Sequence, residues 1–126
     1  MVANFLADDG EHGRRAREAL RGSELVAPSL VDLEVIAALR GHERGGKLAS
    51  PRAAQAIADL SDMPMLRFPT EPLIPRIWEM RHNCSSYDAA YVALAEAFDL
   101  PLVTADAPLA QFAESHCEVT LLGSVG

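Results

Sequence analysis

The chain has 126 residues and is 49% hydrophobic, which is long and apolar enough for a globular domain with its own core and excludes a disordered protein. Its net charge is −7, and this acidic balance argues against a protein that binds nucleic acid through charge alone. No apolar run reaches the length of a membrane span, and no signal peptide is visible. We therefore expect a cytoplasmic protein that does not enter a membrane.

The distribution of charge and the spacing of the cysteines further limit the possible classes of protein. All eleven Lys and Arg lie between Arg14 and Arg81, and the six acids after Arg81 are accompanied by no Lys or Arg. Such a chain can still act on nucleic acid if cations neutralise an acidic pocket, although a solvated acidic surface explains the charge equally simply. Cys84 and Cys117 lack CxxC spacing and are expected to be free, partly buried thiols.

Helical and strand patterns alternate along the chain, as in an α/β domain with a mainly parallel sheet. Helices are predicted, in order, over residues 11–21, 30–40, 50–60 and 71–82, then from Ser86 and over 107–115. Strands are predicted over residues 24–27, 65–68, 100–103 and 118–122. Functional residues of such a domain belong at the carboxyl ends of its strands.

Glu34 lies on an otherwise apolar face of the predicted helix 30–40, and Ser29 is expected to cap that helix. A carboxylate on an apolar face is costly unless it is paired, hydrogen-bonded or bound to a metal. A structural explanation, a partner such as Arg40 or Arg14, and a functional explanation are equally open for this residue. Asp32, on the other side of the helix, is expected to be solvent-facing or structural.

Asp88 and Asp106 each have a structural explanation when considered alone. Asp88 is the third residue of a predicted helix after Ser85, which is the spacing of a capping box. Asp106 precedes Ala107 and Pro108, as the first residue of a capped helix often does.

Taken together, Glu34, Asp88 and Asp106 suggest a different role. An α/β arrangement can bring the start of a helix, the face of a helix and the end of a strand to one edge of the sheet. Carboxylate oxygens are the ligands preferred by hard cations such as Mg²⁺ and Mn²⁺. A site in which such a cation activates a water to attack a phosphodiester is the leading hypothesis.

Four segments carry a resemblance to a known family. Tyr87-Asp-Ala-Ala-Tyr-Val-Ala-Leu-Ala-Glu-Ala followed by Pro101-Leu-Val-Thr-Ala-Asp106 resembles the PIN-domain ribonucleases, and within them the VapC toxins of toxin–antitoxin pairs. Ala27-Pro-Ser-Leu-Val-Asp-Leu-Glu-Val35 resembles the second acidic motif of that family, and the helix around Ile77-Trp-Glu-Met-Arg-His82 is also similar to family members.

The resemblance implies a single domain over residues 1–126 with a three-layer α/β/α fold. It implies cleavage of RNA that depends on Mg²⁺ or Mn²⁺, a homodimer, and a cognate antitoxin of the VapB type that covers the active site. Glu34, Asp88 and Asp106 would be the second, third and fourth acids and would hold the metal. Thr104 would place a hydroxyl close to the site.

The N-terminus departs from the family pattern. The family begins with a central strand that ends in Asp-x-Ser or Asp-x-Thr, and that Asp is the first metal ligand. Met1 to Gly10 resembles the first helix and loop of the family instead, so the first strand and its acid are expected to be missing and the domain to be incomplete at its N-terminus. A start upstream of Met1 and a degenerate toxin are the two explanations. In either case we expect this exact chain to bind metal weakly.

Secondary roles and rival functions remain open. Arg81 and Asn83 are candidates for contact with RNA or antitoxin, with capping of a helix C-terminus as the alternative. A basic rim is possible at Arg14, Arg15, Arg17, Arg40, Arg44 and Lys47. Trp78 is expected in the core or a dimer contact, and the histidines on the surface.

One rival is a catalytically impaired PIN-like module that still binds its antitoxin. A receiver domain is excluded by the absence of a late Lys, and an enzyme with a Cys nucleophile lacks a strand-to-helix elbow.

Overall fold

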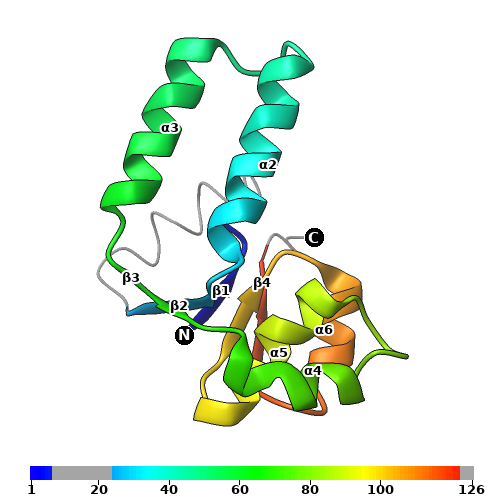
Figure 1. Ribbon diagram of the computed structural model, residues 1–126. Coiled ribbons are helices and arrows are strands. Elements are labelled where there is room, and N and C mark those ends of the chain that lie inside the picture. The colour runs from blue at the N-terminus through cyan, green and yellow to red at the C-terminus, as the bar shows by residue number, and fades with distance from the viewer. Residues whose placement is uncertain (7–23, 123–126) are drawn as a thin grey trace.

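The computed structural model describes residues 1–6 and 24–122, which form a five-stranded parallel sheet in the order β3-β2-β1-β4-β5 (Figure 1). The strands are β1 (Val2–Asn4), β2 (Leu25–Pro28), β3 (Met65–Phe68), β4 (Leu102–Thr104) and β5 (Val119–Leu121). Four of them match predicted strands within two residues. The helix predicted over residues 11–21, with Arg14, Arg15 and Arg17, lies outside the described residues.

The strand that was predicted to be missing is present. β1 occupies the middle of the sheet and pairs in parallel with both β2 and β4. Val2 and Ala3 are fully buried, because neighbours on both sides and covering groups on both faces surround them. The prediction of a helix here was wrong: only three residues form the strand, and Asn4 stands at its end in place of the expected acid.

The helices are α2 (Val31–Arg44), α3 (Ser50–Asp62), α4 (Ile74–Glu79), α5 (Ser86–Phe98) and α6 (Ala107–Ala113), with a 3₁₀ turn at Glu71–Leu73. α2 continues through Gly41, where an end was predicted, and Ser29 does not cap it but donates a hydrogen bond to the carbonyl of Phe68. The helix predicted over residues 71–82 is divided, since Pro72 and Pro75 each begin a new short turn.

α5 is the central helix of the core. All residues from Ala89 to Ala95 are buried, so this helix is covered on every side, and it contacts β1, β2 and β4. Leu102, Val103 and Thr104 of β4 are likewise all buried, although successive strand residues point to opposite faces. Both faces of the sheet are therefore covered, which confirms the predicted three-layer α/β/α architecture. α2 and α3 form a hairpin that projects beyond the sheet (Figure 1).

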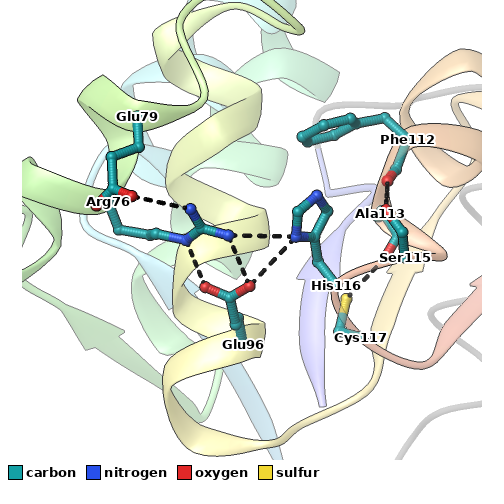
Figure 2. Close-up of polar contacts among 8 residues, drawn as sticks. All are labelled: Arg76, Glu79, Glu96, Phe112, Ala113, Ser115, His116 and Cys117. Carbon is teal, nitrogen blue, oxygen red and sulfur yellow. Dashed lines mark hydrogen bonds and ion pairs between the residues drawn. The ribbon is translucent and has the colours of Figure 1, made fainter.

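An ion-pair cluster fastens the helices on one side of the sheet. Arg76 of α4 donates two hydrogen bonds to the carboxylate of Glu96 on α5, at 2.6 and 3.0 Å. His116, just after α6, contacts both of them through Nδ1 (Figure 2). The prediction that His116 is a simple surface residue was wrong, because this cluster holds it with its side chain 22% exposed.

Three further predictions have outcomes in the fold. Cys84 and Cys117 are free and partly buried, as predicted. Trp78 is 65% exposed, so of its two expected places the core is wrong and a dimer contact stays a prediction. Within residues 1–6 and 24–122, none of the helices combines the length and the apolar character needed to span a membrane.

Candidate functional site

The strand order places a crevice at the carboxyl ends of β1 and β4. From β1 the chain order runs outward to β2 and β3 on one side and to β4 and β5 on the other. In open parallel sheets such a switch point is where ligands bind. Asn4 ends β1 and is the register partner of Thr104, which ends β4.

A cavity of about 390 Å³ lies at this crevice and collects the three acids that the sequence predicted. Its lining residues are Asn4, Phe5, Leu6, Glu34, Asp88, Tyr91, Ala105 and Asp106. Glu34 comes from α2, Asp88 from the first turn of α5, and Asp106 from the segment between β4 and α6. Three acids that are distant in sequence therefore face one cavity.

Asp88 and Asp106 also perform the structural roles that their sequence contexts predicted. The backbone N–H of Asp88 donates to the hydroxyl of Ser85, at 3.1 Å, which caps α5. One carboxylate oxygen of Asp106, Oδ1, accepts the backbone N–H of Leu109 at 3.0 Å and caps α6. These caps fix where both residues lie, so the structural and functional roles are compatible.

Glu34 is held by a residue that sequence reasoning missed. The Tyr91 hydroxyl donates a hydrogen bond to Glu34 Oε1 at 2.5 Å. Of the two basic partners considered for Glu34, Arg40 forms no ion pair with it, and Arg14 lies outside the described residues. Tyr91 is three residues after Asp88 on α5, and this spacing places both on one face of the helix. That spacing was the available signal in the sequence. Asp32, by contrast, forms an ion pair with Arg67 and is structural.

The carboxylates perturb one another electrostatically. Burial raises the pKa of Glu34; the Tyr91 hydrogen bond lowers it in part, and the charge of Asp88 raises it further. Burial also raises the pKa of Asp88, and the charge of Asp106 adds to that increase. Tyr91 has its pKa raised by burial and by Glu34, so its hydroxyl stays protonated and remains a donor. The cavity therefore holds negative charge that no cation of the described residues neutralises.

This donor set fits a hard divalent cation, with one qualification. Within the described residues, no three His, Cys, Asp or Glu side chains are gathered tightly enough to form a direct metal cage. Mg²⁺ does not require one, because it is usually held by one or two carboxylates and keeps several waters. The volume of the cavity leaves space for those waters, and the crowded carboxylates supply the negative charge.

The remaining candidate residues lie differently. Thr104 is fully buried beneath the cavity, and its hydroxyl links Asn4 to Asp106. Arg81 and Asn83 are exposed, and neither lines the cavity. Arg81 stacks on the Trp78 ring at 4.3 Å and donates to the Trp78 carbonyl, and the backbone N–H of Asn83 bonds the Met80 carbonyl. Both contacts agree with the alternative of a helix C-terminal cap.

Comparison with known proteins identifies the family. The PIN-domain family model matches residues 2–115, which includes β1 and all of the cavity residues. The chain belongs to the PIN-domain family. Among its relatives are the VapC ribonucleases, in agreement with the resemblance seen in the sequence.

Two such relatives cover nearly the whole chain. Ribonuclease VapC9 of Mycobacterium tuberculosis is 37% identical over 117 residues, which span 93% of this chain and 89% of that protein. Ribonuclease VapC1 of the same organism is 38% identical over 122 residues, spanning 96% of this chain and 92% of that protein.

A solved structure supports the fold independently. The crystal structure of PAE2754 from Pyrobaculum aerophilum superposes with a TM-score of 0.68, over 94% of this chain and 87% of that one. The two sequences are only 21% identical, so this likeness concerns the fold alone. This PIN domain therefore keeps a parallel α/β architecture across a large sequence distance.

Proposed function

We propose that this PIN domain is a metal-dependent endoribonuclease toxin that cleaves RNA phosphodiesters in the cytoplasm. The observation that carries the proposal is the single cavity at the sheet switch point, lined by Glu34, Asp88 and Asp106. The relatives named VapC ribonucleases support the same activity. The free thiols of Cys84 and Cys117 are consistent with a reducing compartment.

In this proposal each acid has a defined part. Hydrogen bonds from Leu109 and Tyr91 orient the carboxylates of Asp106 and Glu34, and the Ser85 cap fixes the backbone of Asp88, so all three residues are positioned before a ligand enters. They would hold Mg²⁺ or Mn²⁺, as Glu34, Asp88 and Asp106 lie on different walls of one cavity. When bound, such a cation neutralises phosphate charge and lowers the pKa of a water. Phe5 and Leu6, which are buried, supply an apolar part of the cavity lining.

The direct test is RNA cleavage with and without Mg²⁺ by the wild-type chain and by Asp88→Asn. Asn keeps the size of the side chain but removes one charge from the cavity, so cleavage is expected to fall by at least roughly a hundredfold. Asp62→Asn is the matched control, because Asp62 is an exposed acid at the end of α3, remote from the cavity lining. Cleavage that continues in EDTA, or an Asp88→Asn variant as active as Asp62→Asn, would refute the proposal.

The same proposal includes partners. A cognate antitoxin of the VapB type would inhibit the site, and a second copy of the chain would form a homodimer. Exposed apolar side chains give these partners a surface to cover: Ile74 and Trp78 on α4, which are 53% and 65% exposed, and Leu33 on α2, which is 71% exposed.

A second candidate function is a catalytically impaired module that binds its antitoxin without cleaving RNA. Asn4 favours it, because the middle strand ends here in an amide instead of a fourth carboxylate. Fewer charges around a cation lower its affinity. Copurification of a small partner with a chain that shows no Mg²⁺-dependent cleavage would support this alternative over the first.

A further inference from the structure

Asn4 has a defined hydrogen-bonding arrangement at the centre of the cavity. The Thr104 hydroxyl lies 2.6 Å from Asn4 Oδ1 and accepts the backbone N–H of Asp106 at 3.1 Å. Thr104 is fully buried, so its hydroxyl proton needs an acceptor within the protein. Asn4 Oδ1 is that acceptor, which fixes which way the amide of Asn4 is turned.

The consequence is that the amide nitrogen is left for the cavity. Oδ1 is directed at Thr104 on the neighbouring strand β4, and Nδ2 occupies the opposite side of the planar amide. Within residues 1–6 and 24–122, no side chain or carbonyl accepts a hydrogen bond from Nδ2. Asn4 thus presents a donor group to a cavity whose other polar side chains are three carboxylates and the Tyr91 hydroxyl.

The other residues that line the cavity show why this donor matters for binding an anion. Glu34, Asp88 and Asp106 only accept hydrogen bonds when ionised, and the hydroxyl of Tyr91 is already committed to Glu34. Among the described side chains that line the cavity, Asn4 is therefore the one with an uncommitted N–H. An anionic phosphate entering beside three carboxylates requires such a donor to offset repulsion.

We propose that Asn4 is a substrate-binding residue whose amide N–H binds a non-bridging oxygen of the RNA phosphate, and that it is not a metal ligand. This inference rests on the proposed function, since it assigns a role within the same cavity. It predicts that metal binding and RNA binding respond differently to changes at residue 4. The two properties are measured separately below.

The first measurement is a titration with Mn²⁺ alone, in which isothermal calorimetry gives the affinity. Asn4→Ala is expected to bind Mn²⁺ within about twofold of wild type, because it removes no ligand, whereas Asp88→Asn binds it at least about tenfold more weakly. Asn4→Asp adds a fourth carboxylate and is expected to bind Mn²⁺ about tenfold more tightly. It also keeps an acceptor for Thr104, so this variant retains the buried hydrogen bond if Asn4→Ala folds poorly.

The second measurement is the affinity for a short single-stranded RNA in EDTA, which fluorescence anisotropy reports. Both Asn4→Ala and Asn4→Asp lose the N–H donor and are expected to weaken RNA binding by about tenfold, as expected for one hydrogen bond to a charged group. Asp62→Asn is again the control and should bind as wild type does.

Two results would overturn the inference without touching the proposed function. One is a loss of Mn²⁺ affinity in Asn4→Ala as large as that in Asp88→Asn, which would make the Asn4 oxygen a metal ligand. The other is RNA affinity in EDTA that is unchanged in both Asn4 variants. A wild-type chain that cleaves RNA in EDTA would instead refute metal dependence, while the RNA-binding arm would still test the role of Asn4.

Discussion

The hydrogen bond between Tyr91 and Glu34 shows how a single residue prepares the site. Burial makes the ionised form of Glu34 costly and raises its pKa, and the Tyr91 hydroxyl offsets part of that cost. Tyr91 is 2% exposed, so its ring also fills the core beneath the cavity. The ring and the hydroxyl therefore have separable roles, which one substitution can distinguish.

Tyr91→Phe keeps the ring and removes only the hydroxyl. We expect it to lower the free energy of unfolding by about 1–2 kcal/mol, because a partly buried carboxylate loses its hydrogen-bond donor. Urea unfolding at neutral pH measures the change. Tyr87→Phe is the matched control: Tyr87 is 63% exposed and should give no measurable difference. Equal stability of both variants would mean that the hydroxyl contributes nothing.

At the scale of single residues, the sequence predicted the acids but not the groups that hold them. Asp88 and Asp106 each lie in a capping pattern that the structure contains, and it was their combination with Glu34 that pointed to a site. Tyr91 and Asn4 were missed for a physical reason: each acts through a partner from another element, Glu34 on α2 and Thr104 on β4. Such pairings depend on tertiary structure, and the local signal for Tyr91 was limited to its spacing of three residues from Asp88, which places both on one face of α5.

At the scale of elements, the Arg76–Glu96–His116 cluster joins α4, α5 and the segment that follows α6. The paired hydrogen bonds from Arg76 to Glu96 link α4 to α5, and His116 brings in the chain after α6 (Figure 2). Arg76 lowers the pKa of Glu96, chiefly through these hydrogen bonds. The cluster therefore stabilises the folded state while Glu96 is ionised.

Glu96→Gln removes the charge and keeps the side-chain length. We expect a loss of about 1 kcal/mol at neutral pH, because the pair is partly exposed and screened by solvent. Since the folded pKa of Glu96 lies below its ordinary value, this contribution is lost as the pH falls through that folded pKa. Thermal unfolding at neutral and acidic pH tests this. Glu79→Gln is the control, because Glu79 is 63% exposed and makes one contact of 3.3 Å to Arg76.

The helices and strands also differ in how well the sequence predicted them. β3 was predicted with its observed bounds because prolines flank an apolar run on both sides. β1 was missed because Met1 to Gly10 resembles the first helix and loop of the family, and three strand residues are too few to show a period that would contradict this; the strand is recognised only through its pairing with β2 and β4. Gly41 does not end α2, since its hydrogen bonds continue to Gly45. Tertiary packing overrides local preference at both places.

At the scale of the whole molecule, folding creates an electrostatically unfavourable site, because it brings carboxylates together in the cavity. Folding gathers Glu34, Asp88 and Asp106 at the switch point and removes water from them, which raises the pKa of Glu34 and Asp88. The folded state then holds protons that the unfolded chain releases. A cation that binds only the folded state reverses this imbalance, so stability, pH and metal are linked in one property of the domain.

The linkage predicts how stability changes with pH. For Glu34 and Asp88 the folded pKa is raised, so their contribution favours folding below the ordinary carboxyl pKa and is lost as pH rises through the folded pKa. We expect Asp88→Asn to be more stable than wild type near pH 8 and to lose this advantage as the pH falls through the raised folded pKa of Asp88 and below the ordinary carboxyl pKa. Thermal unfolding across this range, with EDTA present, measures the difference.

Adding Mg²⁺ at neutral pH should make the wild type more stable than Asp88→Asn, which reverses their order in EDTA. At about a hundred times its Kd, a ligand that binds only the folded state stabilises it by about 2.7 kcal/mol. Wild type has the full set of three carboxylates and should gain most of this, whereas Asp88→Asn should gain little. Asp62→Asn, altered outside the cavity, should follow wild type in both conditions. An equal gain in all three proteins would place the bound Mg²⁺ elsewhere on the acidic surface.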